Sequence, residues 1–231
     1  MKKVLIITQR DPFFIDSFLR NLEVSKDIDI EILDLPNFNK GKLWALKRAY
    51  ELYGILGTIK LIFIRAYQFF TVKNISSTSL KSSKDLDIYL SSLKANDIVL
   101  SLSAPSIINV KKIPKDVKAI NIHSGRLPDY AGMMPIFWQL MNDEKFLTLT
   151  FHELAENIDT GDIYHEEIIP TDKSLFDLSV QAKIRAAKIF SEKFMNGSYK
   201  TIKKQTSSKH VLNKFPLKQE ILQLRKKKKF L

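Results

Sequence analysis

The sequence predicts an α/β fold, in which helices flank a twisted and mostly parallel β-sheet. Three runs rich in apolar residues, at residues 3–8, 28–35 and 97–103, have the pattern of buried strands. Continuous apolar runs are typical of parallel strands, because helices cover such strands on both faces. With 231 residues, of which 45% are hydrophobic, the chain can bury the core of one α/β domain with an appendage, or of two small domains.

Helical and strand patterns alternate along the rest of the chain, as an α/β fold requires. Asp11-Pro12 begins a turn after the first strand, and residues 104–108 begin another turn and a helix. Residues 74–83, rich in Ser, Thr and Lys, predict a loop. Ser174 with Asp177 resembles a helix cap. Further helices are expected at residues 13–24, 84–94, 134–142 and 174–196, and further strands at residues 117–123, 147–153 and 163–171.

Residues 41–72 are strongly apolar and carry many aromatic side chains. A membrane-spanning helix needs about 20 mostly uncharged residues. Lys60, Arg65, Gly54 and Gly57 interrupt this segment. We therefore expect two helices packed on the body or on a partner chain. A peripheral membrane contact is the less favoured alternative, and a membrane span is the least favoured.

The positive charge is concentrated at the end of the chain. The net charge is +12, and residues 198–231 carry +10 of it, with 11 Lys and Arg against the single acid Glu220. These residues also carry an apolar stripe at Phe215, Leu217, Ile221, Leu222 and Leu224. We expect a catalytic domain at residues 1–197 and a basic C-terminal extension at residues 198–231. Because a nucleic-acid enzyme more often spreads cations over its body, a nucleic-acid partner is not favoured.

The absence of some residue types restricts the function further. The chain has no cysteine, which fits a reducing compartment, and its start lacks the features of a signal peptide. We therefore expect a cytoplasmic protein. No glycine-rich loop follows the first strand, which argues against a dinucleotide-binding role.

Amide, imidazole and carboxylate side chains gather between residues 121 and 162. Asn121 and His123 lie two residues apart at the end of an expected strand, so they point to one face, where sites form in open α/β sheets. An imidazole suits proton transfer, an amide N–H suits a developing oxyanion, and a carboxylate such as Asp159 can orient the imidazole. Each of these residues also has a purely structural alternative. Asn121 and His123 could be ordinary residues at a strand end, and His152 could be a hydrogen-bonded strand histidine. Residues 159–162 could form a simple tight turn.

This stretch resembles the 10-formyltetrahydrofolate-dependent formyltransferase family. The family pattern reads approximately Asn-x-His-x-(Ser/Gly)-x-Leu-Pro, then Tyr-x-Gly-x-x-Pro, Thr-x-His and Asp-x-Gly. The chain matches it at Asn121, His123, Gly125, Leu127, Pro128, Tyr130, Gly132, Pro135, Thr150, His152, Asp159 and Gly161. It departs from the pattern at Ala131, where the family often has Arg. The resemblance covers residues 97–172 well and implies the formyltransferase fold, with a Rossmann-like, mostly parallel sheet and flanking helices.

The resemblance also implies the site and its co-substrate, 10-formyltetrahydrofolate. Asn121, His123 and Asp159 become the expected catalytic residues. The expected folate-binding residues are Ser103, Ala104, Pro105, Ile107, Gly132, His152 and Asp162. For the loop at residues 103–107, a plain turn between strand and helix is the alternative. No metal is expected, because the His and Asp spacings match no compact metal motif.

The acceptor amine is the remaining question. Members of the family formylate methionyl-tRNA, glycinamide ribonucleotide or amino sugars on nucleotide carriers, and others hydrolyse the formylfolate. Residues 198–231 are too few for the C-terminal domain of the methionyl-tRNA enzymes. Phe137-Trp138 and residues 159–162 look most like the nucleotide-sugar enzymes. We expect N-formylation of a nucleotide-linked amino sugar, with a homodimer as one possible assembly. The alternatives are a methionyl-tRNA or other small-amine formyltransferase, or an RNA- or membrane-binding protein on an inactive domain.

Overall fold

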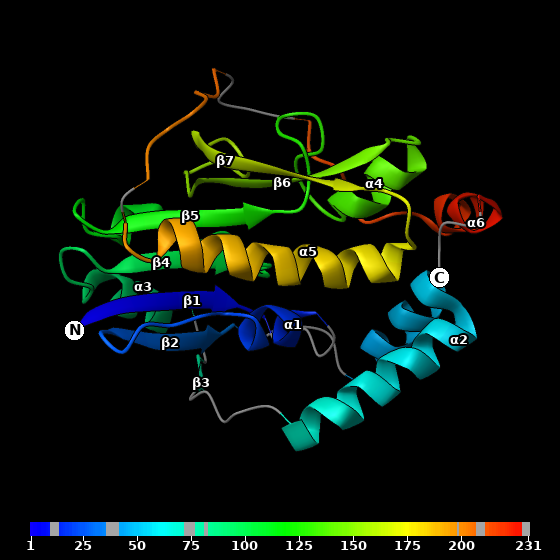
Figure 1. Cartoon of the computed structure of the whole chain (residues 1–231), viewed down its shortest axis with the longest axis horizontal. Helices are drawn as coiled ribbons and strands as arrows, with labels where there is room; N and C mark the ends of the chain where they lie inside the picture. Colours follow the sequence, from blue (N-terminus) through cyan, green and yellow to red (C-terminus); the bar gives the residue numbers. More distant parts are fainter. Residues whose placement is uncertain are drawn as a thin grey trace.

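A computed structural model describes residues 1–9, 14–35, 42–71, 77–80, 83–197, 199–206 and 211–227. Within these residues, seven strands form one sheet in the order β3-β2-β1-β4-β5-β6-β7 (Figure 1). The strands are β1 (Lys2–Thr8), β2 (Ile28–Asp34), β3 (Ser77–Ser79), β4 (Ile98–Leu102), β5 (Lys118–His123), β6 (Phe146–Glu153) and β7 (Ile163–Pro170). The helices are α1 (Ile15–Arg20), α2 (Lys42–Thr71), α3 (Ser83–Ser91), α4 (Pro135–Met141), α5 (Leu175–Ile189) and α6 (Lys218–Lys226), with short helical turns at Val110–Lys112 and Phe190–Phe194.

The sheet is parallel through its centre and antiparallel at one edge. Strand β1 pairs in parallel with both β2 and β4, and β5 pairs in parallel with β4. Strands β6 and β7 then continue the sheet as antiparallel partners. The chain therefore reverses its direction of travel across the sheet between β1 and β4, and this is the kind of point where α/β folds form sites. The predicted fold class is confirmed.

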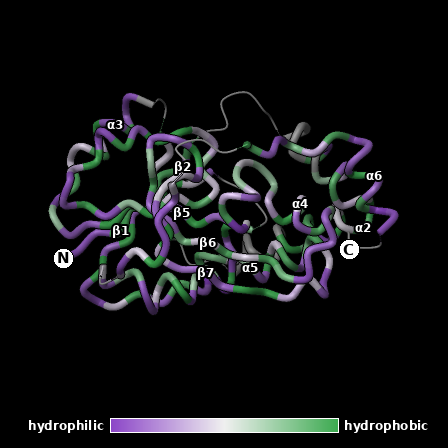
Figure 2. The backbone as a smooth tube through the Cα atoms, turned by 90° about the horizontal axis from the view of Figure 1, so that it is seen from above, coloured by the Kyte–Doolittle hydropathy of each residue, from purple (hydrophilic) through white to green (hydrophobic). Residues whose placement is uncertain are grey.

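Two helical layers cover the two faces of the sheet. In β1, Val4 and Ile6 belong to the apolar cluster that includes residues of α1 and α5, and Leu5 and Ile7 belong to the cluster that includes α3. Figure 2 shows α3 and α5 on opposite sides of the strands. The alternation follows from the strand period of two. Each of these fully buried side chains contributes roughly 1.5–3 kcal/mol relative to an exposed one.

Helix α5 begins at the cap that the sequence indicated. The Ser174 hydroxyl accepts a hydrogen bond from the Asp177 N–H at 3.1 Å and donates one to the Asp177 carboxylate at 2.8 Å. The helix continues into the π-helical turn Phe190–Phe194, whose two phenylalanine rings are stacked. The cap and the buried face fix α5 across the centre of the sheet.

Helix α2 consists of two helices, as predicted, and the chain bends at Gly54, where φ is 67°. Its buried side chains include Ala49, Leu52, Tyr53 and Leu61. Several large apolar side chains of α2 are exposed: Ile55, Leu56, Ile59, Ile62 and Phe63. Among the described helices, none combines the length and apolar character that a membrane crossing requires.

Two local predictions are wrong. The expected loop at residues 74–83 contains β3, a three-residue edge strand made of Ser and Thr, which has no apolar alternation to reveal it. The helix expected after residue 104 is absent between Ser103 and Asn109; Ser103 adopts a positive φ of 56°, and the residue before Pro105 is disfavoured in helical conformation. The turn expected at Asp11-Pro12 lies outside the described residues.

The described parts of the C-terminal segment pack back on the body. Lys203 forms a bridge with Ile163, and Asn213 forms one with Gly132. In α6, Ile221 and Leu224 are buried, whereas Leu217 and Leu222 of the expected apolar stripe are exposed. A spacing of three residues places Ile221 and Leu224 on one helical face.

Candidate active site

The candidate site lies where β5 ends beside β6. Strand β5 carries Asn121 and His123, which are paired across the sheet with His152 and Thr150 of β6. Alternation places Asn121 and His123 on the same face of the strand. His123 and His152 are buried, with 7% and 1% of their surface exposed. Two side chains that the sequence placed together are therefore supported by a rigid sheet.

Asp159 comes to these residues from the turn between β6 and β7. Its backbone adopts a left-handed conformation with φ of 56°. Gly161 follows two residues after Asp159. There is no room for a side chain at this position, because a Cβ would lie 2.0 Å from the Glu153 carbonyl oxygen. The Asp159 carboxylate is anchored through Oδ2, which accepts a hydrogen bond of 2.8 Å from the Gly132 N–H.

The three expected catalytic side chains form one cluster. His123 Nδ1 lies 3.5 Å from Asp159 Oδ2, and Asn121 Nδ2 lies 3.4 Å from Asp159 Oδ1. Asn121 Nδ2 also lies 3.0 Å from His152 Nε2, and His152 Nε2 lies 3.5 Å from Asp159 Oδ1. The carboxylate is thus shared between an amide and two imidazoles.

Hydrogen-bond chemistry assigns the ring protons. His123 Nε2 lies 2.8 Å from the Tyr130 carbonyl oxygen, which can only accept, so Nε2 carries a proton and donates. In the neutral ring, Nδ1 then has a free lone pair on the side of Asp159. By the same argument His152 Nδ1 donates to the Glu153 carbonyl oxygen at 2.7 Å, and its Nε2 accepts from Asn121. His123 is left with a basic nitrogen that faces the cluster.

The electrostatics keep His123 neutral and Asp159 ionised at neutral pH. Burial lowers the pKa of His123, and the nearby Asp159 carboxylate opposes that change by raising it. For Asp159, burial acts to raise the pKa, but the adjacent His123 and His152 rings and the Gly132 N–H lower it to about 2. A neutral imidazole beside a carboxylate is the state that can accept a proton.

Small residues allow the neighbouring loop to approach the imidazole. A Cβ on Gly125 would lie 2.6 Å from the Pro135 Cβ and 2.9 Å from His123 Nε2. The Gly125 carbonyl oxygen accepts a hydrogen bond of 2.7 Å from the buried Thr150 hydroxyl. The family-like glycine at this position is therefore explained by close packing against His123.

The expected folate-binding residues after β4 lie at the carboxyl end of that strand. Ser103, Ala104 and Pro105 are half-buried, and Ile107 is 68% exposed. The Ser103 hydroxyl accepts a hydrogen bond of 2.9 Å from Lys183 Nζ. Lys183 is a buried cation on α5 that sequence reasoning missed, and its charge lowers the pKa of His123. Its position on the apolar stripe of α5, between Ala182 and Ala186, is the signal that could have found it.

Gly132, His152 and Asp162 take part in protein contacts here. Gly132 donates to Asp159, and His152 accepts from Asn121. The Asp162 carboxylate accepts a hydrogen bond of 3.2 Å from the backbone N–H of Gln205. In the part of the chain that the structure describes, no group of His, Asp and Glu side chains could hold a metal ion.

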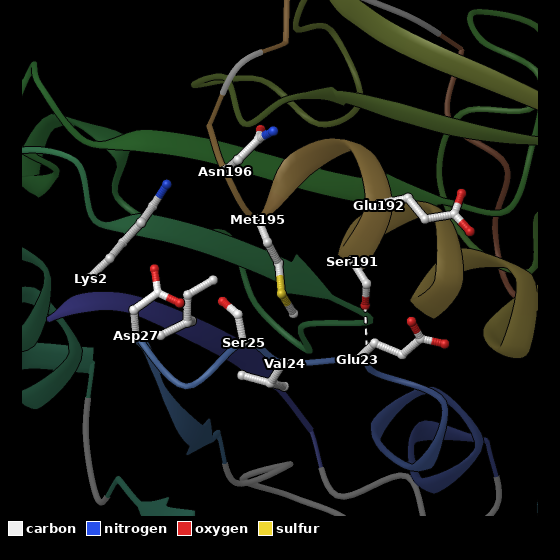
Figure 3. A pocket seen from close by; sticks show the side chains of 10 residues that line it. Lys2, Glu23, Val24, Ser25, Asp27, Ser191, Glu192, Met195 and Asn196 are labelled. Atoms are coloured by element: carbon white, nitrogen blue, oxygen red, sulfur yellow. Dashed lines mark hydrogen bonds between the residues drawn. The ribbon is translucent and has the colours of Figure 1, made fainter.

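Two hollows lie elsewhere on the described surface. One, of about 570 Å³, is found where β1 and β2 begin, and its lining includes Lys2, Asp27 and Met195 (Figure 3). The other, of about 450 Å³, is lined by residues that include Ala119 and Tyr164. Neither is lined by the Asn–His–Asp cluster. Because sites in open α/β sheets form at the carboxyl ends of the strands, the first hollow is not the candidate active site.

Similar proteins were found by sequence. The bifunctional polymyxin resistance protein ArnA of Wigglesworthia glossinidia brevipalpis is 34% identical over 104 residues, which is 44% of this chain and 16% of ArnA. The methionyl-tRNA formyltransferase of Prochlorococcus marinus strain MIT 9312 is 34% identical over 88 residues, which is 35% of this chain and 27% of that enzyme. The aligned segments thus span less than a third of these two relatives.

Similar folds were found among solved structures. A sugar N-formyltransferase from Shewanella sp. FDAARGOS_354 superposes with a TM-score of 0.61 at 18% identity, covering 97% of this chain and 88% of that one. WlaRD, a sugar 3N-formyl transferase crystallised in the presence of dTDP and 5-N-formyl-THF, gives a TM-score of 0.59 at 21% identity, covering 92% of this chain and 69% of that one.

These likenesses in fold agree with the comparison of the chain with protein families. A family model described as Formyl transferase matches residues 68–191, which is more than half of the chain and includes the Asn–His–Asp cluster. The chain belongs to the formyl transferase family.

Proposed function

We propose that this protein transfers a formyl group from 10-formyltetrahydrofolate to the primary amine of a nucleotide-linked amino sugar. The observation that carries the proposal is the buried cluster of Asn121, His123 and Asp159, in which a neutral imidazole lies 3.5 Å from an ionised carboxylate. Formyl transfer needs a base for the attacking amine, an acid for the departing folate nitrogen and a donor for the oxyanion between them.

In this proposal His123 moves the proton. A bond forms between the acceptor nitrogen and the formyl carbon, and the bond between that carbon and the folate nitrogen breaks. The Nδ1 lone pair takes the proton that the acceptor nitrogen loses, and the same proton passes to the departing folate nitrogen. Asp159 stabilises the imidazolium that exists between these two transfers. Atoms and charge therefore balance without a metal ion.

Asn121 is the proposed donor to the oxyanion. One of its amide hydrogens is held by His152 Nε2 at 3.0 Å, and the other lies in a long contact of 3.4 Å with Asp159. The long contact is the one that a developing oxyanion can replace, because it loses little when it breaks. His152 then keeps the amide plane in its orientation.

The folate is proposed to bind beside Ser103, Ala104, Pro105 and Ile107. Apolar surface at Pro105 and Ile107 suits an aromatic pterin, and backbone groups of the turn can hydrogen-bond to its edge. Similar structures support a folate: WlaRD was crystallised with 5-N-formyl-THF, and the N-formyltransferase from Helicobacter canadensis with folinic acid and dTDP-3-aminofucose.

The choice of an amino-sugar acceptor is supported by two similar structures that are described as sugar N-formyl transferases and cover 92% and 97% of this chain. Methionyl-tRNA is the second candidate acceptor, because the similar sequences include methionyl-tRNA formyltransferases. An RNA-binding protein on an inactive domain is disfavoured, because an inactive site has no need to retain Asn121, His123 and Asp159 together.

An acceptor panel tests the proposal. Purified protein and 10-formyltetrahydrofolate are incubated separately with dTDP-linked amino sugars, methionyl-tRNA, glycinamide ribonucleotide and buffer alone. We expect the amino sugar to gain one formyl group by mass. Formylation of methionyl-tRNA alone would select the second candidate, and release of formate in buffer alone would indicate hydrolysis.

A further inference from the structure

The C-terminal segment contacts both loops that hold the catalytic carboxylate. We call its described parts, residues 203–206 and 211–214, the C-terminal strap. They lie outside residues 68–191, which the family comparison matches. Figure 1 shows this part of the chain running past the β6–β7 end of the sheet before it enters α6.

Gln205 binds the turn that carries Asp159. Its side-chain Nε2 donates to the Asp159 carbonyl oxygen at 3.1 Å and to the Gly161 carbonyl oxygen at 2.7 Å. Its backbone N–H donates to the Asp162 carboxylate. Since Asp159 is held with φ of 56°, a conformation that non-glycine residues seldom adopt, the turn depends on such contacts to keep its shape.

Asn213 binds the opposite loop. Its backbone N–H and side-chain Nδ2 donate to the Ala131 carbonyl oxygen at 2.8 and 3.1 Å, and its own carbonyl accepts from the Met133 N–H at 2.8 Å. Gly132, which lies between Ala131 and Met133, packs closely against Asn213: a Cβ on Gly132 would be 2.5 Å from the Asn213 carbonyl oxygen. The Gly132 N–H is the group that binds Asp159 Oδ2, so the strap reaches the carboxylate from two directions.

The Gln205 amide forms hydrogen bonds through its nitrogen. Its Oε1 is buried and has no hydrogen-bond partner among the described residues. Leaving a buried amide oxygen unpaired is unfavourable, and the two hydrogen bonds that the amide nitrogen donates offset that cost. What the amide supplies is two donors that converge on the Asp159 turn.

We propose that Gln205 is a positioning residue of the active site, whose amide holds the Asp159 turn so that the carboxylate stays beside His123. The inference rests on the proposed function for its kinetic consequence, but not for its structural one. When the amide is removed, the turn relaxes and Asp159 moves away from His123. A displacement of about 1 Å at a reacting group costs up to roughly 100-fold in rate.

Moving Asp159 away from His123 should change the pKa of His123, a change that a purely structural role of Gln205 would not produce. The His123 ring faces the Asp159 carboxylate from the β6–β7 turn, His152 from β6, Lys183 from α5 and the Tyr130 carbonyl group. Of the side chains among these, Asp159 raises the pKa of His123, whereas His152 and Lys183 lower it. Loss of Asp159 from its place therefore lowers the pKa of His123 further.

The test compares wild type with Gln205→Met, which keeps the length of the side chain and removes both donors. We expect kcat to fall by roughly 10- to 100-fold with little change in folate affinity by calorimetry. We also expect the His123 ring to titrate at lower pH in an NMR experiment on the free protein. Gln205→Leu, which also removes both donors and adds no charge, should behave in the same way and serves if the methionine variant does not fold.

The matched control is Gln223→Met, the same substitution at an exposed glutamine of α6, which should leave both readouts at their wild-type values. A Gln205→Met protein with wild-type kcat and an unchanged His123 titration would overturn the inference. The NMR comparison needs no substrate. It therefore decides the role of Gln205 even if wild type transfers no formyl group, a result that would instead refute the proposed function.

Discussion

Asp159→Asn should remove a pH-dependent part of the stability of this protein. The folded state holds the pKa of this carboxyl at about 2, against an ordinary value of 3.8. Because the side chain is only 7% exposed, solvent screens the interaction weakly. A difference of nearly two pKa units corresponds to about 2–3 kcal/mol of folding free energy.

The sign follows from the direction of the shift. A depressed carboxyl pKa stabilises the folded protein at pH values above 3.8, and this contribution is lost as the pH falls through about 2. By pH 3, about 1 kcal/mol of it is gone. Asparagine has nearly the same shape but does not titrate, so the variant lacks this loss.

Carboxyl ¹³C NMR of the wild type from pH 6 to pH 3 measures the effect directly, because a stability curve also contains the titration of His123, whose pKa depends on Asp159. The Asp159 signal, identified by its absence in Asp159→Asn, should remain mostly ionised at pH 3. Asp116, at an exposed position, gives the reference titration. An Asp159 carboxyl that titrates near its ordinary value of 3.8 would refute the reasoning that the folded site holds this carboxylate ionised.

Three further substitutions test other parts of the site. Asn121→Ala should lower kcat by roughly 10²- to 10³-fold in steady-state assays, whereas a change in KM alone would show that the amide positions substrate instead. Lys183→Met should raise the pKa of His123, so the acidic limb of the pH–rate profile should move to higher pH; an unmoved limb counts against the role of Lys183. Gly161→Ala should destabilise the protein by about 1–3 kcal/mol in thermal unfolding, because the new Cβ would meet the Glu153 carbonyl; an unchanged Tm contradicts this packing.

The sequence predicted those parts of the site whose spacing along the chain is fixed by local structure. Asn121 and His123 lie on one strand, so their common face follows from the strand period. Asp159 was placed beside them by family resemblance, and the structure brings its carboxylate to 3.5 Å from His123.

Long-range contacts left no such local pattern. Lys183 reaches Ser103 from a helix 80 positions away in the sequence, and Gln205 reaches Asp159 from 46 positions away. Strand β3 was missed because three Ser and Thr residues pair at a sheet edge without burying an apolar face. The boundary at residue 197, drawn from a change in charge, stays a prediction about folding units.

The central claim is that the buried Asn–His–Asp cluster catalyses formyl transfer through His123. Its most direct test is a single-turnover reaction with 10-formyltetrahydrofolate and a nucleotide-linked amino sugar, followed by mass spectrometry, for wild type and His123→Ala. The account predicts that wild type adds one formyl group to the sugar. It also predicts that the variant, with unchanged circular dichroism and folate binding, reacts at least about 100-fold more slowly. A folded His123→Ala protein that formylates the sugar at nearly the wild-type rate would contradict it.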